Sequence, residues 1–351
     1  MDIWLTLIPI FREERQEKDN SLNSKMIIDL RFSTIKEPLP GFIYKDLRSF
    51  SRKSNDYFPQ PRVLIKLLSE KFETKKENIF LTAGSDEAIL TLSKIYKKTV
   101  VVFTPTYMEY ANKKIFGSNI IKINALTSTG YFIDPCYYPG ASIIFIGNPN
   151  NPIGVVDKET IYELIKNNQK TIIVVDETYG EFFDNSVVKN VNKFNNLVVL
   201  RSFSKDYGMA GIRIGFMVAN KEVIQRVKEL TQLTNTSYLS VGAAISAISH
   251  EDYFIKLRSR VTKERDLFTR FLISNKLKVI TSNINVVLLK FTNKKNSKKF
   301  YDFLKKHDIY TNLGNAGSNI GLDKSYVRIA IGTQKEMRIV KETIKKYISN
   351  N

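Results

Sequence analysis

The 351-residue sequence has very few cysteines and histidines, and these shortages limit the chemistry available to it. Cys136 is the single cysteine, which excludes an intramolecular disulfide and a cysteine-based zinc cluster. The two histidines, His250 and His307, fall in stretches with helical patterning near the C-terminus, far from the strand ends described below. We therefore expect neither histidine to act as a general base, and we predict no metal site.

Long apolar runs and flexible linkers are also missing. No apolar stretch is long enough to cross a bilayer, and the opening MDIWLTLIPIFREER lacks a basic leading segment and is interrupted by Pro9. The sequence therefore predicts neither a signal peptide nor a membrane partner, and it indicates a cytoplasmic protein. No stretch is rich in Gly, Ser or Pro, so we expect any two domains to pack against each other.

Acidic residues are too few to balance the basic ones. Lys and Arg total 54, Asp and Glu total 35, and the formal net charge is +19. Such a surface attracts anions, either polyanions or small anionic metabolites. We predict no nucleic-acid partner, because the sequence has no zinc-finger spacing, no compact helix-turn-helix signal and no basic stripe interleaved with aromatic residues.

The sequence does contain a series of short apolar, β-branched runs that alternate with helical patterns. These runs lie at 78–84, 99–105, 141–149, 170–177, 196–203 and 213–220. Near-continuous apolar strands separated by helices predict an α/β fold, with a mostly parallel sheet flanked by helices. The pattern after about residue 240 predicts a smaller α+β domain. The expected division is an N-terminal segment, 1–50, that joins the small domain, a large domain, 51–240, and a small C-terminal domain, 241–351.

Polar or aromatic groups follow five of the predicted strands, where ligands bind in open α/β sheets. They are Gly84, Ser85 and Asp86 at a helix start, then Tyr107, Asn151, Asp176, Tyr179, Ser202, Ser204, Lys205 and Arg213. Each has an ordinary structural explanation when it is taken alone, such as a helix cap, a turn or a solvated lysine. Together they offer a phosphate seat, a stacking ring, a carboxylate for a ring nitrogen and a lysine for a Schiff base. Pyridoxal phosphate requires these groups.

Several segments carry a resemblance to a known family. NPNNPIG, VVDETYGEF and SFSKDYGMAGIRIGF resemble the signature blocks of fold-type I, pyridoxal-phosphate-dependent aminotransferases of class I and II. TAGSDEAI, TPTYMEY and YVRIAIGT are most similar to the histidinol-phosphate aminotransferase branch. The resemblance covers nearly the whole chain, and it implies a large cofactor-binding domain and a smaller α+β domain.

The resemblance also implies roles for individual residues. Lys205 would carry pyridoxal 5′-phosphate as a Schiff base and later move a proton between the substrate α-carbon and the cofactor. Asp176 would pair with the pyridine nitrogen and keep the ring an electron sink. Asn151 and Tyr179 would hydrogen-bond the 3′ oxygen of the ring, and Tyr107 would stack on its face.

Further matched residues would hold the phosphate and the substrate. The implied phosphate ligands are Ser202, Ser204, Arg213 and the backbone N–H groups of Gly84, Ser85 and Asp86. Arg328, with Asn151 beside it, would bind the anionic end of the substrate. Members of the family are homodimers in which a tyrosine reaches the phosphate of the partner subunit. We expect Tyr57 in that position rather than Phe58, because phenylalanine has no hydroxyl.

Two departures from the branch pattern bear on the substrate. TSYLSVG at 236–242 keeps Tyr238 but lacks the asparagines of a PYNVN-like segment, and FSTIKEPLPGF at 32–42 is closer to the opening of threonine-phosphate decarboxylases. The resemblance implies amino transfer between a donor such as glutamate and a small anionic acceptor. Histidinol phosphate and imidazole acetol phosphate, in histidine biosynthesis, are the leading pair. Another amino acid aminotransferase and a threonine-phosphate decarboxylase are the alternatives.

Two rival classes are less well supported. Ser202 to Lys205 fits the S-x-x-K pattern of serine–lysine acyl enzymes, but the S-D-N and K-T-G elements of that class are absent. A non-catalytic binding protein on the same fold would have little reason to keep Lys205, Asp176 and Arg213 together. We therefore predict an enzyme with small-molecule partners.

Overall fold

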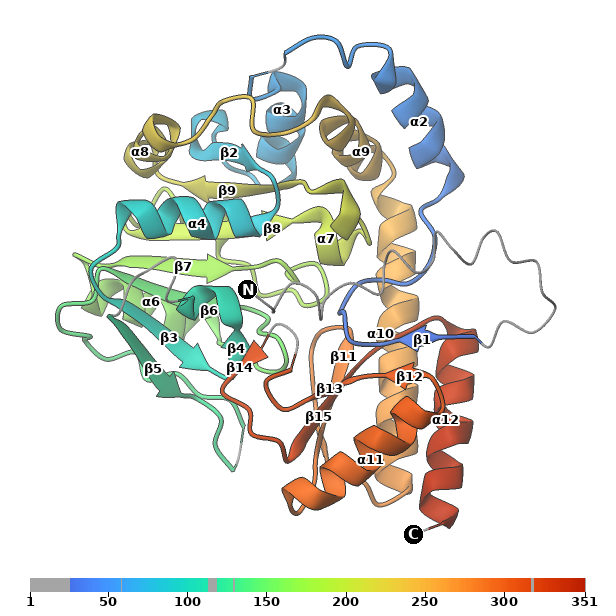
Figure 1. The fold of residues 1–351 in the computed structure, drawn as a ribbon. Coiled ribbons are helices and arrows are strands. Elements are labelled where there is room, and N and C mark those ends of the chain that lie inside the picture. The colour runs from blue at the N-terminus through green and yellow to red at the C-terminus, as the bar shows by residue number, and fades with distance from the viewer. Residues whose placement is uncertain (1–25, 58, 113–118, 129, 317–318, 351) are drawn as a thin grey trace, which may run out of the picture.

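The computed structural model describes residues 26–57, 59–112, 119–128, 130–316 and 319–350. Its main feature is a seven-stranded sheet with helices on both faces (Figure 1). In spatial order the strands are β2 (Ile79–Thr82), β9 (Gly215–Ala219), β8 (Leu197–Ser202), β7 (Ile172–Asp176), β6 (Ile143–Gly147), β3 (Val100–Thr104) and β5 (Ile120–Asn124). The expected mostly parallel sheet is confirmed, with β9 antiparallel to both of its neighbours.

Alternate residues of the central strands face two separate apolar cores. Ile143 and Phe145 of β6 pack with the helices α4 (Ser85–Ile95) and α8 (Lys221–Leu230). Ile144 and Ile146 belong to the larger core on the other face. The helices that contribute to that core include α3 (Arg62–Lys71), α6 (Lys158–Asn167) and α9 (Tyr238–Ser249). Burial on both faces explains why these strands are apolar throughout rather than alternating.

A second, four-stranded antiparallel sheet forms in the C-terminal part of the chain. Its order is β10 (Val279–Ile280), β11 (Val286–Lys290), β15 (Tyr326–Ala330) and β13 (Asn312–Leu313). The helices of this part are α10 (Glu251–Ser274), α11 (Lys294–Lys306) and α12 (Gln334–Ser349). A capping box formed by Thr333 and Glu336 starts α12, which follows β15 closely. These strands and helices confirm that the fold includes the predicted smaller α+β part.

Short strands connect distant parts of the sequence. β1 (Ile28–Asp29) pairs in parallel with β12 (Ile309–Tyr310), so the N-terminal segment lies on the C-terminal part. β14 (Asn319–Ile320) pairs antiparallel with β4 (Thr106–Tyr107). The helix α2 (Gly41–Ser51) then packs against α9, as the upper right of Figure 1 shows. The domain boundaries that we predict at residues 50 and 240 stay predictions.

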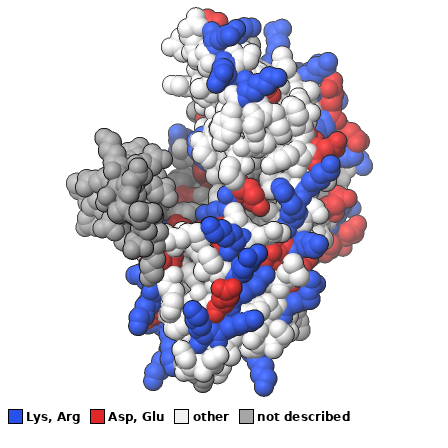
Figure 2. All heavy atoms as spheres, turned by 90° about the vertical axis from the view of Figure 1, so that its right-hand side faces the viewer, with Lys and Arg blue, Asp and Glu red and all other residues white. Residues whose placement is uncertain are grey.

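The remaining elements are short and lie in the connections. The 3₁₀ turns are η1 (Lys76–Asn78), η2 (Met108–Ala111), η3 (Val188–Asn190) and η4 (Ala210–Ile212), and the one-turn helix α7 is Phe203–Asp206. Figure 2 shows basic side chains spread across one face of the molecule with acidic ones between them. No helix in the described parts of the chain has both the length and the apolar character that crossing a bilayer requires.

Candidate active site

A cavity of about 380 Å³ lies at the carboxyl ends of β6, β7 and β8. This is the edge of the sheet where the strand order predicts a ligand site. The predicted site residues that line it are Ser85, Asp86, Tyr107, Asn151, Asp176, Tyr179, Ser204, Lys205 and Arg213. The fold therefore brings together residues that are widely separated in the sequence.

Lys205 projects from the turn α7, directly after β8. Ser202 caps this turn, because its hydroxyl accepts a hydrogen bond from the Ser204 backbone N–H at 3.1 Å and donates to the Ser204 hydroxyl at 2.9 Å. Burial, and next the positive charge of Arg328, lower the pKa of Lys205 to about 8. Among the described residues, no carboxylate forms an ion pair with the Lys205 amine. The site therefore holds an amine that loses its proton far more readily than an ordinary lysine, whose pKa is 10.5.

A buried ionic cluster supports α7 from behind. Arg258 of α10 forms an ion pair with Glu251 at 2.6 Å and donates to the backbone carbonyl of Asp206, the residue after Lys205. The hydroxyl of Tyr207 donates to Glu251 at 2.6 Å. These contacts join the lysine-bearing turn to the long helix α10. We infer that they hold the turn in place, since removing one partner of a buried pair is strongly destabilising.

Asp176 ends β7 and is almost completely buried. One carboxylate oxygen accepts hydrogen bonds from the backbone N–H and the hydroxyl of Thr178, at 2.9 and 2.6 Å. The other accepts from the Tyr110 hydroxyl at 2.6 Å. Burial raises the pKa of Asp176, although the bonds from Thr178 and Tyr110 act in the opposite direction. A buried carboxylate of this kind gains most from a cationic N–H partner, such as a protonated pyridine nitrogen.

The start of α4 and the loop before β9 form a third side of the cavity. Gly84 has φ 81°, and a Cβ atom there would lie 2.6 Å from the Arg213 guanidinium. Glycine at this position therefore leaves room for the Arg213 guanidinium beside the start of α4. Arg213 forms an ion pair with Asp86 at 3.0 Å, and the Tyr107 hydroxyl donates to Asp86 at 2.9 Å. A helix N-terminus with an arginine beside it suits a phosphate group.

Arg328 lies on β15 and is buried, although it does not line the cavity. Its Nη1 donates to the side-chain oxygen of Asn151 at 2.9 Å and also to that of Asn319. Its Nη2 donates to the backbone carbonyl of Arg31 at 2.7 Å. Burial lowers the pKa of Arg328 to about 10, and Tyr179 acts in the opposite direction.

The Nε atom of Arg328 is buried and has no hydrogen-bond partner among the described residues. Within the same part of the chain, no carboxylate forms an ion pair with this guanidinium. Nε and Nη2 lie along one edge of the guanidinium, which is the edge that binds a carboxylate through two hydrogen bonds. Nη2 already donates to the Arg31 carbonyl, so Nε is the donor on this edge that the described contacts leave for an anionic group of a ligand.

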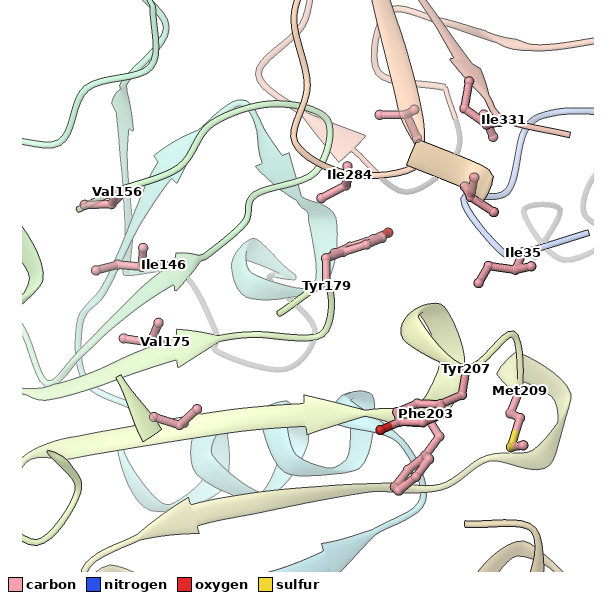
Figure 3. Close-up of a cluster of buried hydrophobic side chains, with 14 of the residues drawn as sticks. Ile35, Ile146, Val156, Val175, Tyr179, Phe203, Tyr207, Met209, Ile284 and Ile331 are labelled. Atoms are coloured by element: carbon pink, nitrogen blue, oxygen red, sulfur yellow. The ribbon is translucent and has the colours of Figure 1, made fainter. Parts of the chain in front are cut away.

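Asn151 and Tyr179 connect Arg328 to the centre of the cavity. The side-chain amide of Asn151 donates to the Tyr179 hydroxyl at 3.0 Å. Burial raises the pKa of Tyr179 to about 12, so the phenol keeps its proton. Figure 3 shows Tyr179 within the buried cluster that also contains Ile35 and Ile284.

Four predicted residues do not line the cavity. Gly84 and Ser202 lie next to lining residues and contact Arg213 and Ser204, respectively. Arg328 reaches the cavity through Asn151. Tyr57 is 88% exposed, and the alternative Phe58 lies outside the described residues. The contact between Tyr57 and a partner subunit stays a prediction.

Sequence reasoning missed several residues that the structure places at the site. Tyr110 lines the cavity. It is the second tyrosine of TPTYMEY, and its place three positions after Tyr107 was the available signal in the sequence. Phe32 lines the cavity, and Ser33 contacts Tyr179. Asn319 donates to the Asn151 backbone carbonyl at 2.8 Å, and no local pattern marks it.

The assembled residues fit pyridoxal phosphate. The Gly84–Arg213 approach provides a phosphate seat, and Asp176 provides a buried carboxylate for the ring nitrogen. Lys205 provides an amine with a lowered pKa, and the unpaired Arg328 Nε provides a donor for a substrate anion. The expectation that this cofactor binds here therefore has support in the chemistry of the donors.

Comparisons with known proteins point to one family. The family model for aminotransferase class I and II matches residues 49–344. Histidinol-phosphate aminotransferase 1 of Carboxydothermus hydrogenoformans is 32% identical over 296 residues, which cover 80% of this chain and 81% of that protein. The histidinol-phosphate aminotransferase of Brachyspira hyodysenteriae is 30% identical over 340 residues, with coverages of 92% and 93%.

Solved structures show the same fold. The histidinol-phosphate aminotransferase from Clostridium acetobutylicum matches with a TM-score of 0.81 and 24% identity, covering 93% of this chain and 100% of that one. The L-threonine-O-3-phosphate decarboxylase from Porphyromonas gingivalis matches with a TM-score of 0.79 and 21% identity, covering 92% and 100%. Structural similarity at this level of sequence identity shows the fold, and it does not distinguish amino transfer from decarboxylation.

Proposed function

This chain belongs to the class I and II aminotransferases, which use pyridoxal 5′-phosphate, and we propose that its acceptor is imidazole acetol phosphate, with glutamate as the amino donor. The product would be histidinol phosphate, an intermediate of histidine biosynthesis. Relatives that bear this name cover most of the chain at about 30% identity. The observation that carries the proposal is Arg328, a buried guanidinium without a carboxylate partner among the described residues.

The chain supplies binding groups for each part of the cofactor. Ser204, Arg213 and the first N–H groups of α4 would hold the phosphate. Asp176 would hold a proton on the ring nitrogen, while Asn151 and Tyr179 would hydrogen-bond the 3′ oxygen. When bound, pyridoxal phosphate supplies an electron sink for the pair that is released when a bond to the substrate α-carbon breaks.

Proton transfer falls to Lys205. Its amine would hold the cofactor covalently until the amino group of the substrate takes its place. Because burial and Arg328 keep its pKa near 8, the freed amine can accept the proton of the substrate α-carbon and return it at the next step. Arg328 would bind glutamate through its carboxylate and would orient the α-carbon toward Lys205.

A homodimer is part of the same proposal. Tyr57 is strongly exposed in the single chain, and other large apolar side chains are exposed on α3 and near α8 and α9. They include Val63, Leu230, Leu233 and Leu239. Large apolar side chains that are exposed in a single chain are candidates for an interface. We propose that this surface is covered by a second copy and that Tyr57 reaches the phosphate bound by the partner subunit.

One observation favours the alternative reaction, decarboxylation of threonine phosphate. The segment 32–42, whose sequence is closer to the decarboxylases, contacts the site, because Phe32 lines the cavity and Ser33 bonds to Tyr179. The two reactions use the same cofactor residues. They differ in which bond to the α-carbon is held perpendicular to the ring.

The experiment is a visible absorbance spectrum of the cofactor-supplemented protein before and after addition of L-glutamate. A visible band that bleaches, and returns on addition of imidazole acetol phosphate, supports the proposal. A band that glutamate leaves unchanged, together with carbon dioxide release from threonine phosphate, would replace it with the decarboxylase. Bleaching that only other keto acids reverse would keep amino transfer and reject this acceptor.

A further inference from the structure

The N-terminal segment places a serine hydroxyl against the phenol of Tyr179. The Ser33 Oγ and Tyr179 Oη atoms are 2.6 Å apart, and both residues are buried, with exposed fractions of 3% and 6%. They are separated by 146 positions in the sequence, so the contact depends on the tertiary fold.

The segment around Ser33 is held firmly on both sides. Before it, β1 pairs with β12, and the Arg31 backbone carbonyl accepts hydrogen bonds from Arg328 and Asn312, both at 2.7 Å. After it, Ile35 is buried in the main apolar core. Ser33 is therefore positioned by its neighbours and does not depend on the contact with Tyr179 to keep its place.

Counting protons gives this contact a direction. A tyrosine hydroxyl has one hydrogen to donate and can accept two hydrogen bonds. Asn151 already donates to Tyr179 at 3.0 Å. If the Tyr179 hydrogen points to the 3′ oxygen of the cofactor, as the proposed function requires, then the Ser33 hydroxyl must be the donor in the bond to Tyr179. The hydroxyl of Tyr179 would then accept twice and donate once.

We propose that Ser33 is a positioning residue whose hydroxyl donates to Tyr179 and thereby directs the Tyr179 hydrogen at the 3′ oxygen of the bound cofactor. The inference rests on the proposed contact between Tyr179 and that oxygen. A hydroxyl that accepts hydrogen bonds is also a stronger donor, because chains of hydrogen bonds polarise one another. Ser33 thus strengthens the stabilisation of negative charge on the 3′ oxygen.

This role predicts a change in the pKa of the nitrogen that joins Lys205 to the cofactor, which can be measured without substrate. Negative charge on the 3′ oxygen favours the protonated form of the nitrogen that joins Lys205 to the cofactor. Weaker donation by Tyr179 leaves more of that charge in place, so the pKa of this nitrogen rises. We expect Ser33→Ala to raise it by about half a unit to one unit, which corresponds to one hydrogen bond of ordinary strength.

The test is a pH titration of the visible absorbance of the holoenzyme, with matched variants. Ser33→Thr keeps a hydroxyl and should restore the wild-type midpoint. Thr34→Ala removes the neighbouring hydroxyl, which lies outside the cavity lining, and should leave the midpoint unchanged. A Ser33→Ala midpoint equal to that of the wild type would overturn the proposal, as would a failure of Ser33→Thr to restore it.

A second pair of variants separates the role of Ser33 from that of Tyr179. Tyr179→Phe should raise the midpoint, and adding Ser33→Ala to it should cause no further rise, because the acceptor of the Ser33 bond is gone. A further rise in the double variant would show that Ser33 acts by another route.

If Tyr179→Phe shifts the midpoint and Ser33→Ala does not, only the role of Ser33 fails. If Tyr179→Phe causes no shift, the contact with the 3′ oxygen fails as well. Neither result depends on which compound is the amino acceptor of the enzyme.

Discussion

The two sides of the active site are built in different ways. On the side of Asp176 and Lys205, the residues follow strands of the large sheet, and several of the hydrogen bonds that hold them come from near neighbours in the sequence, although Tyr110 also donates to Asp176. Thr178 donates to Asp176, and Ser202 caps the turn that carries Lys205. On the side of Arg328, the contacts come from distant segments, namely the Arg31 carbonyl and the Asn151 side chain.

This difference suggests a division of labour. Groups fixed by a rigid sheet and by local hydrogen bonds suit the cofactor, whose chemistry is common to the family. Groups fixed by contacts between segments suit the substrate, because small changes in those segments alter what binds without disturbing the sheet. The comparison predicts that variants on the first side lower the rate of chemistry, whereas variants on the second side change substrate use.

Replacing Lys205 should have the largest effect. Lys205→Ala removes both the covalent attachment and the proton carrier, so we expect no detectable turnover and no visible cofactor band. His250→Gln and His307→Gln serve as controls and should keep most of kcat, since neither ring lines the cavity. Substantial turnover by Lys205→Ala, or its loss in a histidine variant, would contradict the assignment.

Asp176→Asn should come next. An amide cannot hold a proton on the ring nitrogen, so we expect kcat to fall on the order of 10²- to 10³-fold, the usual loss for one preorganised electrostatic group. The visible band should persist, because Lys205 is intact. Asp184→Asn changes an exposed acid after the same strand and should leave kcat unchanged. A loss below tenfold in Asp176→Asn would argue against the contact.

Arg328→Lys tests the opposite side. Lysine keeps the charge but loses the edge that makes two hydrogen bonds, so we expect kcat/KM for glutamate to fall about 10- to 100-fold. The visible band should be unchanged. Arg338→Lys alters an exposed arginine on α12 and is the matched control. Loss of the cofactor band in Arg328→Lys would show that the two sides are not separable.

The same difference decides what the sequence could predict. Asp176 and Lys205 were identifiable because each directly follows an apolar strand, and such strand ends meet at one edge of the sheet. Arg328 was placed only by resemblance, within YVRIAIGT. Ser33 and Asn319 gave no signal, since their positions depend on pairings of two-residue strands, β1 with β12 and β14 with β4. Strands that short carry no periodicity.

The antiparallel strand β9 was also beyond the sequence pattern. Its apolar run, GFMVA, is buried throughout like those of the parallel strands, so composition does not distinguish its direction. Direction follows from the connection between β8 and β9, which contains only the turns α7 and η4 and no crossover helix. A parallel neighbour requires a longer crossover, usually a helix. That short connection is also the segment that carries Lys205 and Arg213.

The smallest expected effect is on the pKa of Lys205, which the positive charge of Arg328 lowers from the other side of the site. The pKa of Lys205 lies near 8 rather than 10.5, with burial the largest cause and Arg328 the next. Only the neutral amine can bond to the cofactor aldehyde, so the rate of cofactor uptake by the apoprotein should rise with pH to a midpoint near 8. In Arg328→Gln a nearby positive charge is lost, which favours the protonated amine and moves the midpoint upward. Because burial remains, the midpoint should stay below 10.5. Stopped-flow absorbance across this pH range measures it. An unchanged midpoint would show that the two sides act independently, and a lower one would contradict the assigned effect of Arg328.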